Sequence, residues 1–392
     1  RSRSRGGPMK LILAGGGTGG HLFPAVALAQ RLLGTDPEAQ VLFVGTERGI
    51  EAKILPELAL PLKTIDMAGF VGKGPMAKLA VLPRLLRSIR QSVRLLREFQ
   101  PDVVVGVGGY ASAPVLLAAR LKGVPYLIHE QNAWPGLANR LLSGGARRVC
   151  LSFADSDCAF HRGRTVLTGN PLRAGMEECP AIPQGKPLLL VFGGSRGASA
   201  INEAMVRVLP KLEEFRGKLE ILHQTGTADL DRVFSGYAEA GWDSQGVQPF
   251  IHDMSGAYAR AHLVVCRAGA TTLAELTACG RPAILIPYPF AAADHQSANA
   301  RALARKGAAL MLPQSELTPE RLARMVGDLF RDRERLLAMG AAARSLAKRG
   351  AADLILKECR AVAGKDGNPT ENSSAIPRQP YDMNQEDLEK TG

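Results

Sequence analysis

One short segment near the start of the chain combines a glycine-rich loop with a histidine. Residues 15–21 read GGGTGGH, and Gly15, Gly17 and Gly20 satisfy the spacing G-x-G-x-x-G. Such a turn exposes backbone amides, and the helix that follows adds a positive partial charge that attracts anions. His21 can accept a proton near neutral pH. The segment predicts phosphate binding beside a general base, while a plain tight turn and a nicotinamide-dependent oxidoreductase remain alternatives.

Two further glycine turns follow apolar runs later in the chain. They read GVGGYASAP (106–114) and GGSRGA (193–198), and the second of these precedes an amphipathic stretch from about residue 198. Three such loops exceed what a simple dehydrogenase needs. A cleft with a glycine loop on each side suits two substrates that both carry diphosphates.

Apolar runs alternate with amphipathic stretches, which predicts an α/β fold of two doubly wound domains with parallel sheets. Ligands then gather beyond the carboxyl ends of the strands. The strands are expected at 11–14, 41–44, 103–107, 126–129 and 149–153 in the first half, and at 188–192, 219–224, 248–251, 263–266 and 283–287 in the second.

The chain of 392 residues is too long for one ordinary core. We expect an N-terminal domain at 9–168, a C-terminal domain at 169–345, a helix at 346–362 that returns to the N-terminal domain, and a disordered polar tail at 363–392. Met9 is a plausible alternative start. The boundary near residue 169 rests on Gly169 and Pro171, which break regular structure.

Composition narrows the class of partner. The formal net charge is +12, which suits nucleic acid, anionic lipid or a phosphorylated substrate, but aromatic residues make up only 5%, so nucleic acid is not expected. The six cysteines form no C-x-x-C or Cys/His cluster, which predicts a reducing compartment and no structural zinc. No signal-peptide core or long apolar run is seen, so we expect a cytoplasmic protein.

Residues 67–97 contain no acid and are rich in both leucine and basic residues. Such a segment can lie on an anionic membrane surface. An ordinary core helix with a solvated basic face is the alternative. The basic residues are Lys73, Lys78, Arg84, Arg87, Arg90, Arg94 and Arg97.

Seven motifs between about residues 10 and 360 together resemble the MurG family, the N-acetylglucosaminyltransferases of glycosyltransferase family 28. They occur in the order GGGTGGH (15–21), GVGGYASAP (106–114), HEQN (129–132), GNPLR (169–173), GGSRGA (193–198), CRAGATTLAE (266–275) and DHQSANA (294–300).

The resemblance implies the GT-B fold, in which two Rossmann-like domains face each other across a cleft. It implies inverting transfer of N-acetylglucosamine from UDP-GlcNAc to the C4 hydroxyl of lipid I, the undecaprenyl-diphosphate-linked MurNAc-pentapeptide, giving lipid II for peptidoglycan. Lipid I would bind the N-terminal domain and UDP-GlcNAc mainly the C-terminal one. The family further implies a peripheral protein on the cytoplasmic face of the inner membrane, roles in cell shape and cell division, and other cell-wall synthesis proteins as partners.

The resemblance also assigns site residues. His21 is the first candidate for the catalytic base and Glu130 the second. The donor contacts carried over are Thr18, Gly19, Gly20, Asn132, Arg173, Ser195, Ile251, Ala270, Thr271, Thr272, Leu273, Ala274, Glu275 and Gln296. For the acceptor diphosphate we expect Gly16, Gly17, Gly108, Gly109 and Tyr110. Ser297 stands where some members have a second glutamine, and the tail after residue 364 has no family counterpart.

Four of these residues have clear chemical roles and ordinary alternatives. Glu275 can accept both ribose hydroxyls, or be a solvated helical glutamate. Arg173 can pair with a phosphate, or lie on the surface. Ile251 can flank uracil and offer its backbone to the base edge, or belong to the core. Gln296, with Asp294 beside it, can bind sugar hydroxyls; the alternative is that Asp294 simply caps the helix that follows.

No cofactor is expected. Asp155, Ser156 and Asp157 formally give a D-x-D metal motif, but it lies at a domain edge away from the glycine loops. Helix dipoles can stabilise the UDP without an ion, with free magnesium at most modulating activity. A related GT-B lipid glycosyltransferase, a UDP-sugar epimerase and a non-catalytic nucleotide-sugar scaffold are the remaining alternatives.

Overall fold

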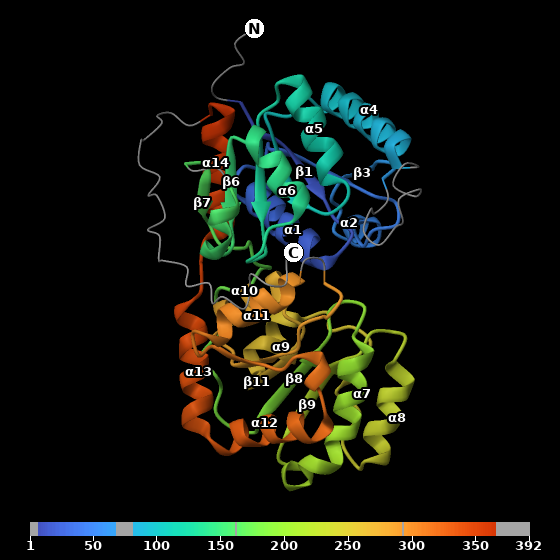
Figure 1. The fold of residues 1–392 in the computed structure, drawn as a ribbon, viewed down its shortest axis with the longest axis vertical. Helices are drawn as coiled ribbons and strands as arrows, with labels where there is room; N and C mark the ends of the chain where they lie inside the picture. The colour runs from blue at the N-terminus through green and yellow to red at the C-terminus, as the bar shows by residue number, and fades with distance from the viewer. Residues whose placement is uncertain (1–6, 68–80, 161–162, 292–293, 366–392) are drawn as a thin grey trace, which may run out of the picture.

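The computed structural model describes residues 7–67, 81–160, 163–291 and 294–365, which form two α/β domains stacked along the long axis (Figure 1). Each domain is a parallel sheet with helices on both faces. The predicted α/β class with two Rossmann-like domains is therefore confirmed.

The N-terminal sheet has the order β3-β2-β1-β4-β5-β6-β7. Its strands are β1 (Lys10–Gly15), β2 (Gln40–Gly45), β3 (Leu62–Thr64), β4 (Val103–Gly108), β5 (Tyr126–Glu130), β6 (Arg148–Leu151) and β7 (Thr165–Leu167). Its helices are α1 (Gly19–Thr35), α2 (Glu51–Glu57), α4 (Val81–Phe99), α5 (Ser112–Lys122) and α6 (Leu137–Leu142), with the 3₁₀ turns η1 (Ser143–Gly145) and η2 (Ala154–Ala159).

After Lys10, strand β1 is apolar and buried, as expected for a strand whose two faces are both covered by helices. Leu11 and Leu13 face one core cluster that includes Leu28 of α1, while Ile12 and Ala14 face the other, which includes Leu116 of α5. The register between β1 and β4 shifts after Ala14, where the first glycine loop begins.

The C-terminal sheet repeats this order as β10-β9-β8-β11-β12-β13. Its strands are β8 (Leu188–Phe192), β9 (Glu220–Gln224), β10 (Val247–Gln248), β11 (Leu263–Cys266), β12 (Ala283–Leu285) and β13 (Ala309–Met311). The helices and turns that follow β8 along the chain are α7 (Ser199–Val208), η3 (Leu209–Phe215), α8 (Leu230–Glu239), α9 (Met254–Arg260), α10 (Ala270–Cys279), α11 (His295–Ala304), η5 (Gln314–Glu316), α12 (Pro319–Arg331) and α13 (Arg333–Ser345), and last α14 (Ala351–Ala363).

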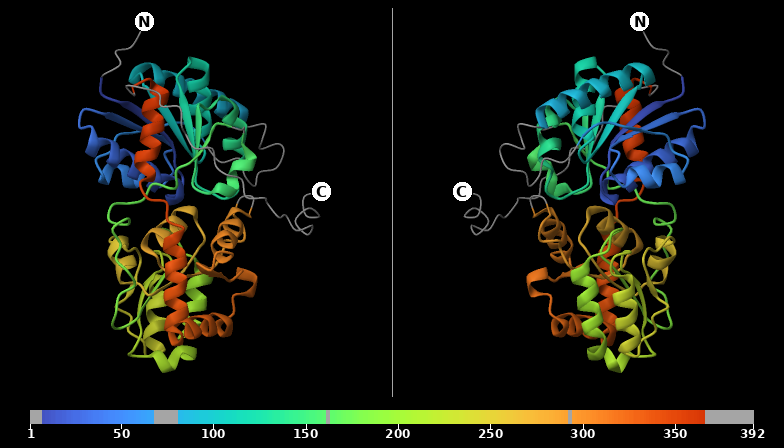
Figure 2. Two further views of the ribbon diagram at one scale, coloured as in Figure 1. Left: turned by 90° about the vertical axis from the view of Figure 1, so that its left-hand side faces the viewer. Right: turned by 90° about the vertical axis from the view of Figure 1, so that its right-hand side faces the viewer.

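The last helix crosses back to the first domain. Ile355, Leu356 and Cys359 of α14 are buried in the N-terminal core, and the Arg31 guanidinium pairs with Asp353 at 2.6 Å. Figure 2 shows α13 and α14 following each other along one side of the molecule, one on each domain. Gly364, in the left-handed conformation, ends α14. The predicted tail lies mostly beyond the described residues.

The ten predicted strands are all present, but some bounds differ. The strand predicted at 248–251 stops at Gln248, because Pro249 cannot donate a ladder hydrogen bond. Three short strands, β3, β7 and β13, were not predicted, since three residues each carry too little pattern. No helix in the described part of the chain is both long and apolar enough to cross a membrane.

Candidate active site

A cleft of about 800 Å³ separates the two domains. The first glycine loop and Gln131 line it from the N-terminal side, and the third glycine loop and the start of α10 line it from the C-terminal side. In Figure 1, α10 and α11 lie at this junction. Both sheets thus direct the carboxyl ends of their strands toward one cavity, as expected for doubly wound folds.

The first two glycine loops pack directly against each other. The Gly16 amide donates to the Gly108 carbonyl at 3.3 Å. A Cβ atom on Gly109 would lie 2.2 Å from the Gly16 carbonyl oxygen, and Gly109 has a φ of +80°. Close backbone contact therefore requires glycine here, independently of any ligand.

A buried carboxylate supports the first glycine loop. Glu51 accepts hydrogen bonds from the Gly17 amide at 2.7 Å and from the Thr46 amide at 2.8 Å. Its side chain is 1% exposed. The Gly17 amide is thus engaged with Glu51, while the first-turn amides of Gly19 and Gly20 have no acceptor inside their own helix. No sequence motif pointed to Glu51.

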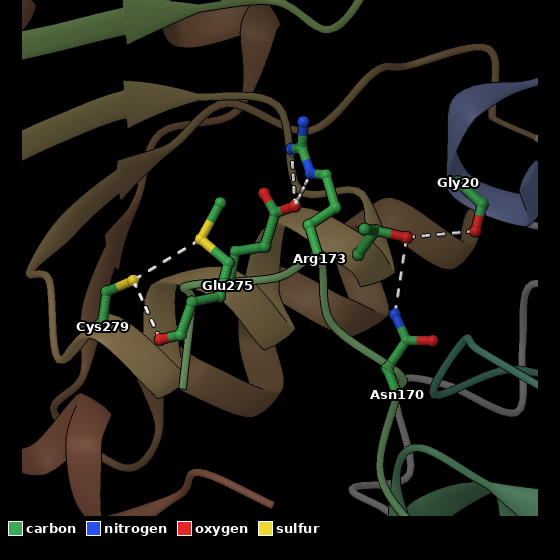
Figure 3. Close-up of polar contacts among 7 residues, drawn as sticks. Gly20, Asn170, Arg173, Glu275 and Cys279 are labelled. Carbon is green, nitrogen blue, oxygen red and sulfur yellow. Dashed lines mark hydrogen bonds and ion pairs between the residues drawn. The ribbon is translucent and has the colours of Figure 1, made fainter. Parts of the chain in front are cut away.

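A proline in α1 creates one of the contacts between the domains. Pro24 has no N–H and so cannot bond the Gly20 carbonyl, its usual partner four residues earlier. The Thr271 hydroxyl of α10 donates to that carbonyl at 3.0 Å and accepts a longer bond from the Asn170 side chain at 3.4 Å (Figure 3). The predicted phosphate ligand Thr271 therefore uses its hydroxyl to join the domains.

Asn299 of α11 makes a second interdomain contact. Its side-chain oxygen accepts from the Ala133 amide at 2.9 Å, and its side-chain nitrogen donates to the Ala268 carbonyl at 3.1 Å. Asn299 is fully buried. It lies within the motif DHQSANA, but its bridging role was not predicted.

Arg173 and Glu275, the two strongest candidates for binding the UDP-sugar, are paired with each other. The Arg173 guanidinium donates to one Glu275 carboxylate oxygen from Nε at 2.9 Å and from a terminal nitrogen at 2.6 Å (Figure 3). Glu275 is only 2% exposed, so the surface reading of this glutamate is wrong. Although burial opposes the charge, pairing with Glu275 raises the pKa of Arg173. The guanidinium also lies 4.8 Å from the centre of the Phe23 ring.

Arg267 brings a further buried cation to the cleft. Its guanidinium donates to the carbonyls of Ile286 and Pro287 at 3.1 and 3.0 Å and to the Gln314 side chain at 2.6 Å. Burial lowers the pKa of Arg267, which shows the cost of holding its charge there. It was not among the predicted site residues.

His21 lines the cleft at the start of α1. Its Nδ1 lies 3.2 Å from the Gln131 side-chain oxygen. Burial lowers the pKa of His21, and nearby His295 acts in the same direction, while Glu130 and the Gln131 hydrogen bond partly oppose the shift. His21 is therefore neutral at pH 7 and able to accept a proton.

Glu130 does not line the cleft. Its carboxylate accepts from the Asn132 amide at 2.9 Å and side chain at 3.2 Å, from the Gly136 amide at 3.1 Å, and from the Asn139 side chain at 2.8 Å. Four donors on one buried carboxylate fix the loop between β5 and α6. The geometry favours His21 over Glu130 as the base.

The backbone predicted to bind uracil is already hydrogen-bonded to other groups of the protein. The Ile251 amide donates to the Gln224 side-chain oxygen at 2.8 Å, and the Gln224 nitrogen donates to the Gly194 carbonyl at 2.9 Å. Ile251 and Ser195 both line the cleft. Gln296 lines it as well, with its oxygen accepting from the Tyr288 amide at 3.0 Å.

The predicted residues fall into two sets. Those that line the cleft are Gly17, Thr18, Gly19, Gly20, His21, Asn132, Arg173, Ser195, Ile251, Ala270, Thr271, Thr272, Glu275 and Gln296. Gly16, Gly108, Gly109, Tyr110, Glu130, Leu273 and Ala274 are outside this lining. Leu273 is turned into the core of the C-terminal domain by the helical period, and Tyr110 is exposed.

The D-x-D segment is used structurally. Asp157 accepts a hydrogen bond from Thr165, and Asp155 lies 3.6 Å from Arg305. Neither aspartate lines the cleft. Across the described ranges, no group of three or more histidine, cysteine or acidic side chains is gathered as a metal site.

These features define a class of protein. Two Rossmann-like domains that close on a cleft with helix N-termini and arginines on its walls are the architecture of GT-B glycosyltransferases. The chain belongs to glycosyltransferase family 28: residues 11–151 match the family 28 N-terminal domain and residues 188–355 its C-terminal domain.

Two bacterial relatives with the same name and one solved structure each match most of this chain. The UDP-N-acetylglucosamine--N-acetylmuramyl-(pentapeptide) pyrophosphoryl-undecaprenol N-acetylglucosamine transferase of Syntrophotalea carbinolica is 65% identical over 91% of this chain and all of its own length. The enzyme of the same name from Geobacter sulfurreducens is 48% identical over the same shares. The crystal structure of Acinetobacter baumannii MurG matches 90% of this chain and all of its own, with 35% identity and a TM-score of 0.72.

Replacing Glu130 with glutamine tests its structural role. The amide has one accepting oxygen and brings an NH₂ group toward N–H donors, so we expect the free energy of unfolding to fall by about 1–3 kcal/mol. Denaturant unfolding measures this change. Glu38→Gln, at an exposed position, is the control. Unchanged stability together with a loss of turnover above 100-fold would instead identify Glu130 as the base.

Proposed function

We propose that this protein transfers N-acetylglucosamine from UDP-GlcNAc to the C4 hydroxyl of the MurNAc-pentapeptide of lipid I, with inversion, to give lipid II. The observation that carries this function is 65% identity, over the full length of the relative, to a transferase named for that donor and acceptor. The cleft supplies suitable chemistry, because it combines helix N-termini, three arginines (Arg173, Arg196 and Arg267) and a neutral histidine.

Donor binding exchanges the partners of the Arg173–Glu275 pair. The diphosphate takes the Arg173 guanidinium and the first-turn amides of α10, which begins at Ala270. Glu275 is then released to accept the two ribose hydroxyls. Uracil lies by Ile251 once the Gln224 oxygen gives up the Ile251 amide, and Gln296 binds the sugar. Ser195, Asn132, Thr18 and Thr272 complete the donor contacts.

The chemical step needs a base and a stabilised leaving group. His21 takes the proton of the acceptor hydroxyl as its oxygen bonds to the anomeric carbon of the donor sugar. The bond from that carbon to the β-phosphate oxygen breaks, and its electron pair leaves with UDP. Arg173 and the positive end of α10 stabilise the charge that develops on the phosphate. The step requires no protein-bound metal or cofactor.

The acceptor is held by the N-terminal domain, and its diphosphate lies near the two packed glycine loops. The Gly17 amide is bonded to Glu51 and the Gly16 amide to the Gly108 carbonyl, so the contacts there come from the exposed Tyr110 side chain and the backbone at Gly108 and Gly109.

Because the acceptor is linked to a lipid, the reaction takes place at a membrane. Helices α4 and α5 form the face of the protein that binds the cytoplasmic side of that membrane. Exposed Leu86 and Leu121 are accompanied by Arg84, Arg90 and Arg94. A shallow groove between the two helices is lined by Ile89, Arg90, Val93, Arg94, Arg97 and Leu121. The protein thus binds peripherally to anionic lipid, and by supplying lipid II it serves cell shape and division alongside other cell-wall proteins.

One assay separates this function from its alternatives. The purified protein is incubated with labelled UDP-GlcNAc and lipid I, and the label is expected in a lipid-linked disaccharide. Conversion of UDP-GlcNAc to another UDP-sugar without acceptor would identify an epimerase, transfer to a different lipid would identify a related glycosyltransferase, and binding without turnover would identify a scaffold.

Glu275→Ala is expected to raise KM for UDP-GlcNAc by about 10- to 100-fold while lowering kcat much less, because ribose contacts are made alike in the ground and transition states. Steady-state kinetics give both constants. Glu334→Ala, at an exposed site on α13, is the matched control. An unchanged KM would remove Glu275 from the ribose site.

His21→Ala is expected to lower kcat by roughly 10² to 10⁴, the usual contribution of a positioned general base, while UDP affinity stays nearly constant. Turnover is measured across pH and UDP affinity by calorimetry. His252→Ala, an exposed histidine outside the cleft lining, is the control. Near-normal turnover at the optimum pH would make His21 structural.

Charge reversal tests the membrane face. Replacing Lys73, Lys78, Arg84 and Arg87 with glutamate is expected to abolish sedimentation with anionic vesicles, since each basic residue near the surface contributes about 1 kcal/mol. Turnover on full-length lipid I should slow, whereas a short-chain soluble acceptor should be spared. Lys73 and Lys78 lie outside the described residues.

The control for this variant reverses four exposed charges on the C-terminal domain: Lys218, Arg324, Arg333 and Arg335. It should still sediment with the vesicles. Unchanged vesicle binding by the α4 variant would locate the membrane face elsewhere, and equal loss on both acceptors would mean that the fold was damaged.

A further inference from the structure

A buried glutamine stands between two histidines at the edge of the cleft. The Gln131 oxygen lies 3.2 Å from His21 Nδ1, and its nitrogen lies 3.2 Å from His129 Nδ1. The same nitrogen donates to the Val107 carbonyl at 2.9 Å. Gln131 is 1% exposed, so these contacts are largely shielded from solvent.

The Val107 carbonyl fixes which way the Gln131 amide points. A carbonyl oxygen can only accept, so the atom 2.9 Å from it is the side-chain nitrogen of Gln131. The second hydrogen of that nitrogen is directed to His129 Nδ1, which accepts it. The Gln131 oxygen is consequently the atom that faces His21.

The proton positions on both imidazoles follow from this orientation. Because His129 Nδ1 accepts, its hydrogen is on Nε2 and is donated to the Gly169 carbonyl at 3.2 Å. Burial lowers the pKa of His129 to about 4, so the ring stays neutral. The Gln131 oxygen can only accept, which puts the hydrogen of neutral His21 on Nδ1 and a lone pair on Nε2.

We propose that Gln131 is a positioning residue that holds His21 as the Nδ1-protonated tautomer, with Nε2 free to take the proton of the acceptor hydroxyl. The second part rests on the proposed function. Gly108 makes the arrangement possible, because a Cβ atom there would lie 3.0 Å from His21 Nδ1 and displace the ring.

Three other titratable groups act on His21: Glu130, His129 and His295. Glu130 favours the charged imidazolium, but both of its oxygens already accept N–H donors from its own loop. His129 is neutral and bonds the Gln131 nitrogen, so it makes no hydrogen bond that would fix the His21 proton. The Gln131 oxygen, 3.2 Å from Nδ1, therefore selects the His21 tautomer together with the backbone hydrogen bond at Val107.

The tautomer can be measured without turnover. Nitrogen-15 NMR of the full chain with labelled histidine, assigned with His21→Asn, distinguishes a protonated from an unprotonated ring nitrogen. The expected result is a protonated Nδ1 and an unprotonated Nε2 on His21. Gln131→Met, which keeps the side-chain length, should populate both tautomers. A wild-type His21 protonated on Nε2, or a tautomer unaffected by Gln131→Met, would overturn the proposal.

Kinetics then test the consequence for turnover. Gln131→Met should lower kcat in proportion to the share of His21 rings protonated on Nε2, about twofold when the two tautomers are equally populated, because the wrong tautomer cannot take the proton. KM for UDP-GlcNAc should stay within twofold of wild type. Loss of an acceptor for the imidazolium also lowers the pKa of His21, so the acid limb of the pH profile should move to lower pH.

Damage to the fold alone would reduce the plateau without moving that limb and would raise KM. A changed tautomer with normal kcat would overturn the positioning role. The lipid I assay decides the proposed function separately, because the NMR result does not depend on the identity of the acceptor.

Discussion

The hydrogen bond from the Thr271 hydroxyl to the Gly20 carbonyl brings the two halves of the cleft together. It exists because Pro24 leaves that carbonyl without its helical donor. The contact sets the N-termini of α1 and α10 facing each other, and the partial positive charges at the two helix ends repel. An anion between them turns this repulsion into attraction. A diphosphate is therefore the ligand that the meeting of the two domains favours.

The charged side chains inside the cleft also favour an anionic ligand. Glu275 and Arg173 are held in a region of low dielectric, where an unpaired charge is costly, and they neutralise each other at 2.6 Å. A UDP-sugar carries both a negative diphosphate and neutral hydroxyls. The diphosphate can take the place of Glu275 beside Arg173, and the hydroxyls can take the place of Arg173 beside Glu275. The Ile251 amide and the Gln224 oxygen offer a similar exchange at the base. In the proposed binding mode, specificity comes from internal bonds that only a matching ligand can replace.

The sequence predicted the fold well because buried parallel strands are apolar runs that end in glycine turns, as at β1 and β8. It placed His21, Arg173 and Glu275 by motif, but it could not choose between His21 and Glu130. That choice depends on which hydrogen-bond donors surround the Glu130 carboxylate and the His21 ring. Gly136 and Asn139 come close enough to bond Glu130 only once the loop has folded. Glu51 and Asn299 were missed for the same reason. The glycines at 108 and 109 looked like phosphate ligands, yet close packing of two loops also explains them.

The most direct test of the account is a crystal structure of this chain with UDP-GlcNAc. The Arg173 guanidinium should leave Glu275 and contact the diphosphate, Glu275 should accept both ribose hydroxyls, and the Thr271–Gly20 bond should remain. A nucleotide bound with the Arg173–Glu275 pair intact and its diphosphate away from the start of α10 would contradict it.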